Sequence, residues 1–241
     1  ENQTFYGFEY QNRNSSYFGR IIYNYNQKYL FQALMRVDGS SRFGTNNRWG
    51  VFWAVSAGWI LSDEAFFTPN NVLSFMKIKG SYGTTGNDRV GNFASLGLSQ
   101  GGSDYNGQPG LAASQAANPD LQWEESSQFD IGFESNWFKN RVRLNTSFYI
   151  KNTDGLLLDF QLPFTSGFTN ITRNAGSMKN TGVDLELGGT VVRRGDFSWD
   201  LDLNVGFLNN EVTELPDATE DEDGNGFLIG SANQRAVVGR S

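Results

Sequence analysis

Three tryptophans in one short stretch constrain the fold more than any other feature of the chain. Along residues 47–59 the large residues recur at every second position, and the residues between them are small. The first row holds Trp49, Val51, Trp53, Val55, Ala57 and Trp59. The second row holds Gly50, Phe52, Ala54, Ser56 and Gly58, in which Phe52 is the one large exception. A period of two predicts a β-strand with two unlike faces.

The two faces of this strand suit a membrane wall. A row of three Trp with Val between them is too large and too apolar to face water, and the opposite row is too small to fill a core by itself. We infer that the aromatic row faces lipid and that the small row faces a bulky body inside a closed sheet.

Composition narrows the possible functions. The 241 residues include no Cys and no His, which excludes disulfides, a Ser-His-Asp triad and an imidazole-ligated zinc site. The net charge of −7 and the pI near 4.7 argue against nucleic acid as a partner. The longest apolar run, residues 51–61, is too short for a membrane-spanning helix. Aromatics make up 15% while the mean hydropathy stays negative, and this combination favours a transmembrane β-barrel.

The same alternation recurs along the rest of the chain. It predicts further strands at residues 17–25, 29–37, 75–83, 128–137, 142–150, 183–188 and 197–207. Most of these strands carry isolated charges in the polar row, and we expect Asp130, Glu134 and Arg143 to pair across neighbouring strands.

The connections alternate between short and long. Tight turns are predicted at residues 26–27, 138–140 and 193–196, and Ser62 is predicted to cap a short helical turn after Trp59. Residues 38–46, 84–125 and 152–173 are predicted loops. In outer-membrane barrels short turns face the periplasm and long loops face the exterior. Aromatics also gather at the short turns, as an interfacial girdle would. They are Tyr25, Tyr29, Trp59, Trp137, Phe138, Phe197 and Trp199.

A soluble or surface-exposed β-sandwich that binds carbohydrate or mediates adhesion is the alternative from another class. Its buried rows would be as apolar as the rows assigned here to lipid. The charges in the polar row and the aromatics at one end favour the barrel over the sandwich.

Five stretches, taken in this order, resemble one known family. They read RVDGSSRFGTNNRWGVFWAVSAGWILSDEAFF, MKIKGSYGTTGND, NPDLQWEESSQFDIGFE, NAGSMKNTGVDLELGG and LDLNVGFLNNEVTELPD. Together they are similar to the barrel portion of SusC/RagA-type TonB-linked outer-membrane transporters of Bacteroidetes.

The resemblance implies an all-β, antiparallel transmembrane barrel segment of the 22-stranded, plugged type with long extracellular loops. It implies a bacterial outer-membrane importer of glycans or peptides rather than an enzyme. A SusD-like surface lipoprotein would be its lid, and TonB would supply its energy. Residues 1–241 are expected to form a partial barrel domain, without a plug, a TonB box or the first and last strands.

Loop-borne polar and aromatic residues are the candidates for contact with a glycan or peptide, because aromatic faces stack on sugar rings and polar side chains bind hydroxyl or peptide groups. They are Arg42, Phe43, Asn46, Arg48, Asn87, Asp88, Arg89, Tyr105, Trp123, Phe164 and Phe168.

An acidic loop near the end of the chain matches the first half of a calcium loop. Its oxygen ligands would be Asp221, Asp223 and Asn225, but Ala232 stands where the bidentate Glu belongs. A solvated acidic hairpin loop is the alternative, and no other cofactor is expected.

Overall fold

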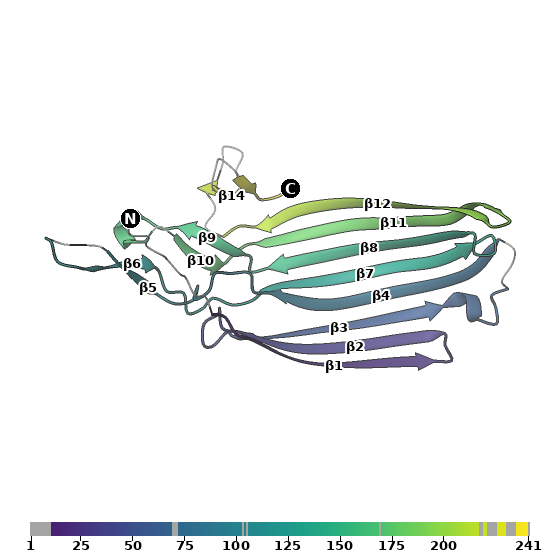
Figure 1. The fold of residues 1–241 in the computed structure, drawn as a ribbon, viewed down its shortest axis with the longest axis horizontal. Helices are drawn as coiled ribbons and strands as arrows, with labels where there is room; N and C mark the ends of the chain where they lie inside the picture. Colours follow the sequence, from purple (N-terminus) through teal and green to yellow (C-terminus); the bar gives the residue numbers. More distant parts are fainter. Residues whose placement is uncertain are drawn as a thin grey trace, which may run out of the picture.

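The computed structural model describes residues 11–68, 72–102, 104, 106–168, 170–216, 219–220, 226–229 and 235–240. Within these residues one large antiparallel sheet has the strand order β1-β2-β3-β4-β7-β8-β11-β12 (Figure 1). Its strands are β1 (Asn14–Tyr25), β2 (Tyr29–Ser40), β3 (Trp49–Ile60), β4 (Leu73–Asn87), β7 (Glu124–Trp137), β8 (Val142–Asp154), β11 (Ser177–Arg194) and β12 (Phe197–Glu214).

Smaller elements lie in the connections. Two hairpins pair β5 (Leu98–Gly101) with β6 (Leu111–Gln115) and β9 (Leu157–Gln161) with β10 (Asn170–Asn174). A third small sheet joins β13 (Thr219–Glu220), β14 (Gly226–Ile229) and β15 (Arg235–Val237). The helical turns η1 (Leu61–Asp63) and η2 (Phe164–Ser166) have three residues each. Within the residues that the structure describes, no helical segment has the length and hydropathy that a membrane span needs.

The strand register gathers apolar residues on one side of the whole sheet. One row of paired residues crosses all eight strands and has no charged member. It consists of Tyr23, Phe31, Ala57, Gly80, Ile131, Phe148, Val183 and Phe207. Because side chains alternate along a strand, this row and its parallel rows define one side of the sheet, called the apolar face below.

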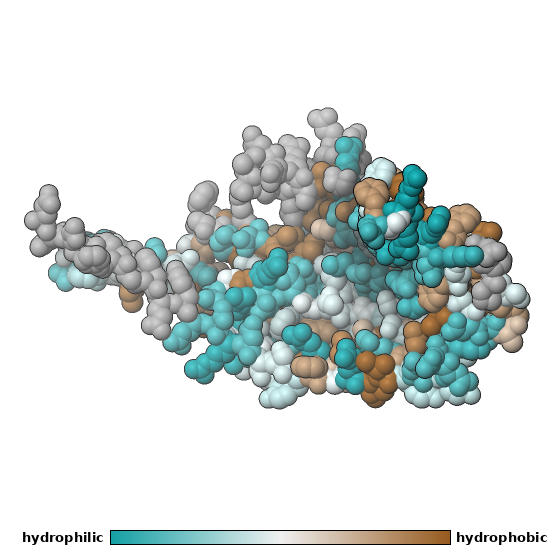
Figure 2. Space-filling model, turned by 45° about the vertical axis from the view of Figure 1, so that its right-hand side comes forward, coloured by the Kyte–Doolittle hydropathy of each residue, from teal (hydrophilic) through white to brown (hydrophobic). Residues whose placement is uncertain are grey.

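The opposite side, called the polar face below, carries a different set of residues. The neighbouring row runs through Gln32, Ser56, Ser81 and Asp130. Hydrophilic residues dominate the side of the molecule shown in Figure 2, which is hollowed near its centre. The two-faced strands predicted from the sequence are therefore confirmed.

The sandwich alternative is wrong. Among the described residues no second sheet packs on the apolar face, and its rings remain exposed, including Trp49 at 54% and Leu201 at 56%. A sandwich would bury these side chains between two layers. The fully buried large side chains are instead Phe43 and Leu121, which lie in the connections and not in the strands.

The predicted short turns are confirmed and share one end of the sheet, on the right of Figure 1. Asn26 and Gln27 both have positive φ, and the Lys28 N–H donates to the Tyr25 carbonyl at 3.1 Å. This is the type I′ geometry that matches the twist of paired strands. The turn after β7 likewise has positive φ at residues 138–140.

Other predictions about the connections need correction. The loop predicted at residues 84–125 contains the end of β4, the β5–β6 hairpin and the start of β7, and that at residues 152–173 contains β9 and most of β10. Ser62 does not cap η1: Ile60 occupies the N-cap position without a side-chain bond, and Ser62 is buried within the turn.

One carboxylate organises the aromatics at the short-turn end. Glu64 accepts hydrogen bonds from the Tyr29 hydroxyl at 2.7 Å, the Trp59 indole at 3.0 Å and the Lys28 ammonium at 3.4 Å. Tyr29 stacks on Trp59 with 6.3 Å between ring centroids, and Phe66 meets Trp59 edge-on at 6.4 Å. Three of the predicted aromatics, Tyr25, Tyr29 and Trp59, are therefore in ring contact at this end. A second stacked pair, Tyr17 and Trp49 at 6.2 Å, lies towards the opposite end of the sheet.

We predict that Glu64 makes stability depend on pH. The hydrogen bond from Tyr29, then that from Trp59, holds the pKa of Glu64 below its ordinary value of 4.5. The contribution of the carboxylate is therefore complete above pH 4.5 and is lost as the pH falls through the lowered folded-state pKa. The stability difference between wild type and Glu64→Gln should shrink in that range, as measured by denaturant midpoints at several pH values. Asp63→Asn is the control, and a pH-independent difference for Glu64→Gln would contradict the prediction.

Candidate functional site

Charges on the polar face pair across strands. Glu134 on β7 binds Lys79 at 2.8 Å and Lys77 at 3.4 Å, both from the neighbouring β4. Arg143 on β8 binds Asp202 on β12 at 2.9 Å. The predicted pairing across neighbouring strands is confirmed for Glu134, whereas Arg143 pairs with the next strand but one, across β11. Asp130 accepts hydrogen bonds from Gln128 at 3.0 Å and from Ser81 on β4 at 3.3 Å.

The Arg143–Asp202 pair spans a strand that lies between its partners. Gly188 of β11 is the register partner of both residues. A Cβ at position 188 would collide with Asp202 and Arg143, so the missing side chain lets the pair close above the backbone. Both side chains are more than half exposed, so the pair contributes at most about 1 kcal/mol to stability.

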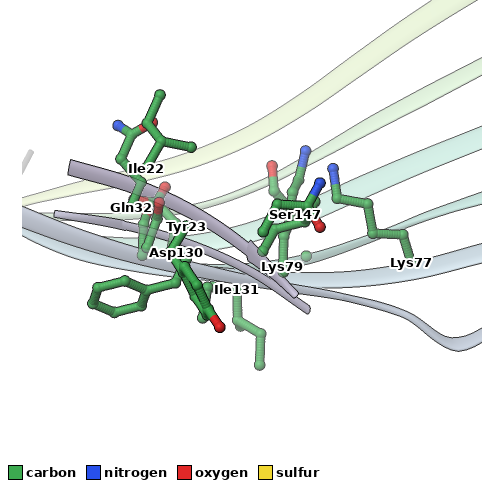
Figure 3. Close-up of a pocket in the computed structure, with 17 residues that line it drawn as sticks. Ile22, Tyr23, Gln32, Lys77, Lys79, Asp130, Ile131 and Ser147 are labelled. Atoms are coloured by element: carbon green, nitrogen blue, oxygen red, sulfur yellow. Dashed lines mark hydrogen bonds between the residues drawn. The ribbon is translucent and has the colours of Figure 1, made fainter. Parts of the chain in front are cut away.

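The centre of the polar face is hollow. A cavity of about 650 Å³ opens between Gln32, Ser56, Lys77, Lys79, Asp130 and Ser147. Figure 3 shows Lys77, Lys79 and Ser147 on one side of the ribbons and Ile131 on the other. Apolar side chains, including Ile22, Leu30 and Ile131, share the lining with these polar groups, so the hollow leaves room for a body of mixed polarity against this wall.

Aromatic side chains pack together at the end of the sheet that carries the long loops. Phe43 is 1% exposed and its ring centre lies 5.0 Å from that of Trp123, which in turn lies 5.6 Å from Phe52. Leu121, two residues before Trp123, is also fully buried. The Gly44 N–H donates a hydrogen bond to the Leu121 carbonyl at 3.3 Å. We call Phe43, Phe52, Leu121 and Trp123 the rim cluster.

The rim cluster explains why Phe52 interrupts a row of small residues. A Cβ at Gly86 of β4, or at Gly50 of β3, would overlap the Phe52 ring. The two glycines therefore leave room for the Phe52 ring. Phe52 is buried there, with 6% of its surface exposed.

Arg42 ties a second loop to the rim cluster. Its guanidinium donates to the Asp88 carbonyl at 2.9 Å and to Asn92 at 3.2 Å, and it lies 3.6 Å from the Asp88 carboxylate. Asp88 also accepts a hydrogen bond from Ser40 at 2.9 Å. This network joins the β2–β3 loop to the segment that follows β4.

An asparagine joins the β9–β10 hairpin to the same rim. The Asn174 side chain donates to the Gln122 carbonyl at 2.7 Å and accepts from the Gln122 N–H at 2.8 Å. The side-chain amide of Asn174 thus forms the same pair of hydrogen bonds with the Gln122 backbone that a neighbouring strand would form. Asn118 adds a bond to the Thr172 carbonyl at 2.8 Å. Three long connections therefore form one interlocked rim.

Five of the predicted ligand residues lie together at the rim. Their side chains contact other residues of the rim. Phe43 and Trp123 pack on each other, Arg42 pairs with Asp88, and Asn87 donates to Glu124 at 3.0 Å. Among the predicted ligand residues, Asn46, Arg48 and Arg89 have exposed side chains.

The structure describes only some of the remaining predicted residues. Phe168 is partly buried in the β9–β10 connection, and Phe164 belongs to η2. Tyr105 and the calcium candidates Asp221, Asp223 and Asn225 lie outside the described residues. Among the residues that are described, no three acidic side chains converge to hold a metal ion.

A smaller hollow next to the rim cluster is lined by polar and apolar side chains and includes residues that the sequence did not single out as ligand candidates. Its volume is about 440 Å³, and its lining includes Ser16, Arg36, Asp38, Thr85, Asp88 and Trp123. Arg36 binds Asp38 at 2.6 Å and donates to Ser16 at 3.3 Å. The inward position of Arg36 in the β2 pattern was the available signal for this hollow.

Comparison with known proteins identifies the family. The model of the family described as TonB dependent receptor-like, beta-barrel matches residues 2–239. The chain belongs to this family.

Its relatives are outer-membrane receptors and transporters. TonB-dependent receptor P39 of Formosa agariphila is 40% identical over 215 residues, which cover 89% of this chain and 21% of the relative. TonB-dependent receptor SusC of Bacteroides thetaiotaomicron is 34% identical over 216 residues, covering 86% and 22%. A structure of the RagAB peptide transporter matches with a TM-score of 0.86 at 34% identity, over 95% of this chain and 25% of that one. The chain thus spans about a quarter of the length of such relatives or less.

Membership of this family indicates what surrounds each face of the sheet and where the protein is located. The sheet is part of an outer-membrane β-barrel wall, so the apolar face contacts lipid and the polar face lines the interior. The end with short turns is periplasmic and the rim is extracellular.

We predict that a charge is tolerated very differently on the two faces. Phe148→Arg places a cation on the apolar face near mid-membrane and should destabilise the barrel by about 2–4 kcal/mol. Ser147→Arg, one residue away on the polar face, should cost much less. Equilibrium unfolding of the full-length protein in lipid vesicles measures both. Equal losses would contradict the assignment of the faces.

We predict that Phe43 stabilises the rim. Phe43→Ala leaves a cavity under Trp123 that should cost about 3–5 kcal/mol locally. Hydrogen exchange at the Gly44 amide should therefore become faster by roughly 100-fold or more, because this amide bonds across the rim to Leu121. Phe66→Ala, at a side chain that is 70% exposed, is the control and should leave Gly44 unchanged. Unchanged exchange in Phe43→Ala would overturn the role of the rim cluster.

Proposed function

We propose that this chain forms part of the wall and extracellular rim of an importer that takes up glycans or peptides across the outer membrane. The observation that carries the proposal is the eight-stranded wall, whose polar face is hollow while its apolar face is exposed. Such a wall encloses a passage when the barrel is complete. TonB would supply the energy and a SusD-like surface lipoprotein would cover the rim.

The named relatives support nutrient import but leave the cargo open. SusC and the RagAB peptide transporter are each 34% identical to this chain, so identity does not favour one kind of cargo over another. The smaller hollow beside the rim offers the charged pair Arg36 and Asp38 together with the aromatic side chain of Trp123. These groups suit hydroxyl-rich sugars and peptide groups alike.

The rim residues divide between two proposed roles. Phe43 is buried and Arg42 is bound to Asp88, so we assign both to holding the loops in place. Asn46, Arg48 and Arg89 project from the same rim with exposed side chains and are the better candidates for direct contact with cargo. Removing a scaffold residue would change loop geometry, whereas removing a contact residue would change affinity alone.

Uptake by living cells tests the proposal. Deletion of the gene in its host should abolish uptake of either labelled oligopeptides or labelled oligosaccharides, and inactivation of TonB should have the same effect. Both cargo classes are offered separately, so the class that is lost identifies the substrate. Normal uptake of both classes after deletion would overturn the proposed function.

We predict that neighbouring residues on β3 differ in their effect on uptake. Ser56→Trp fills the hollow on the polar face and should strongly reduce uptake through the full-length transporter. Val55→Trp points into lipid from the adjacent position and should leave uptake near the wild-type rate. Surface abundance is measured in parallel by labelling intact cells. Equal uptake by both variants at equal abundance would contradict a passage along this wall.

A further inference from the structure

A short segment crosses the rim just before β7 begins. It comprises residues 118–123, called the strap below, and belongs to no strand. One side of the strap is bonded to the β2–β3 loop. The Asn47 side chain donates to the Asp120 carbonyl at 3.1 Å. The Gly44 N–H donates to the Leu121 carbonyl at 3.3 Å. The strap is therefore attached to the loop that carries two of the exposed candidates for cargo contact.

The other side of the strap is bonded to the β9–β10 hairpin, mainly through one residue. The Asn174 side chain donates to the Gln122 carbonyl at 2.7 Å and accepts from the Gln122 N–H at 2.8 Å. The Asn118 side chain adds a hydrogen bond to the Thr172 carbonyl at 2.8 Å. The strap therefore bonds to two connections that are far apart in the sequence.

The sequence of the strap makes it rigid. It begins with a turn in which the Leu121 N–H donates to the Asn118 carbonyl at 3.2 Å. The Asn118 side chain also accepts from the Asp120 N–H at 3.2 Å. Asparagine favours the first position of such a turn, and Pro119 has a fixed φ at the second. A displacement on one side of the strap is therefore passed to the other side, because little bond rotation within the strap can absorb it.

The end of the strap fixes the backbone next to an exposed arginine. The Trp123 indole donates to the Arg48 carbonyl at 3.1 Å, and its ring packs on Phe43 with 5.0 Å between the ring centres. The Arg48 side chain remains exposed. A fixed backbone with an accessible side chain suits a group that binds a ligand from a pre-organised loop.

We propose that Asn174 is a positioning residue for cargo. Through the rigid strap it holds the β2–β3 loop, so the loop and the β9–β10 hairpin open together and present Asn46 and Arg48 in one arrangement. Pre-organised contacts bind more tightly than mobile ones, because less conformational entropy is lost on binding. The contact with cargo rests on the function proposed above, whereas the coupling of the two connections does not.

Hydrogen exchange in the full-length protein tests the coupling. Asn174→Ala removes both side-chain bonds to the Gln122 backbone, and exchange at the Gly44 amide, in the other connection, should become about tenfold faster. Thr172→Ala is the matched control. It removes a side-chain hydrogen bond to Asp159 within the same hairpin, keeps the backbone carbonyl that the strap contacts, and should leave Gly44 unchanged. Acceleration confined to the hairpin in Asn174→Ala would overturn the proposal.

A second variant tests whether the strap is the route of the coupling. Pro119→Gly removes no hydrogen-bonding group but frees the backbone of the turn. In this background Asn174→Ala should accelerate exchange at Gly44 by less than about twofold. An undiminished acceleration would mean that the two connections are coupled by another route and would contradict the proposal. Heat-dependent mobility on gels verifies that each variant folds.

Uptake kinetics test the effect on cargo. Labelled oligopeptides and labelled oligosaccharides are offered separately to cells with equal surface abundance of each variant. Asn174→Ala should raise KM for the imported class about fivefold and leave the maximum rate unchanged, because positioning at the rim affects binding and not passage. Asn174→Ala combined with Arg48→Ala should add little to Arg48→Ala alone, since both act on one contact.

The two measurements separate this inference from the proposed function. Faster exchange at Gly44 with an unchanged KM, or fully additive effects of Asn174→Ala and Arg48→Ala, would overturn the positioning role. Uptake of neither class by the wild type would overturn the proposed function, and the exchange result would still decide whether the strap couples the two connections.

Discussion

Uninterrupted strand register is the constraint on which the rest of this structure depends. Side chains alternate between faces, so a slip of one residue would exchange the apolar and polar faces of a strand. In the large sheet, register shifts occur near strand ends, at Leu73/Phe75, Ser177/Met178 and Thr190/Val192. The interior of the sheet keeps every row in phase from Tyr23 to Phe207. Two-residue turns such as Asn26-Gln27 set this phase locally, because their geometry leaves no freedom in the pairing that follows.

Burial in this segment is distributed unlike that in a soluble domain. The wall exposes its large side chains, and the rim buries Phe43 and Leu121. The wall gains its stability from hydrogen-bonded pairing and from lipid, whereas the rim lies beyond the lipid and must exclude water with its own side chains. This division explains why the rim needs an aromatic cluster together with the Arg42–Asp88 and Asn174–Gln122 contacts.

The sequence predicted the wall well and the rim poorly, for one physical reason. Within the membrane each residue has only two possible surroundings, so the alternation of residues 49–59 or 197–207 reports the strand directly. Above the membrane that contrast ends, and the continuation of β4 through Thr84, Thr85 and Gly86 lacks any apolar signal. The β5–β6 and β9–β10 hairpins were missed as well; β9 (Leu157–Gln161) is apolar, but its leucines are consecutive and do not alternate with polar residues. Contacts such as Arg42 with Asp88 join residues far apart in the chain, and no local pattern encodes them.

The glycines show where inspection of the structure adds to the sequence. In the alternating pattern Gly80, Gly86 and Gly132 look alike, yet their surroundings differ. Gly86 accommodates the Phe52 ring, and Gly132 avoids the backbone of β8, so the fold accounts for both. Gly80 has no such neighbour and faces lipid. At position 80 the fold therefore has room for a Cβ, and the sequence pattern alone could not distinguish this glycine from the other two.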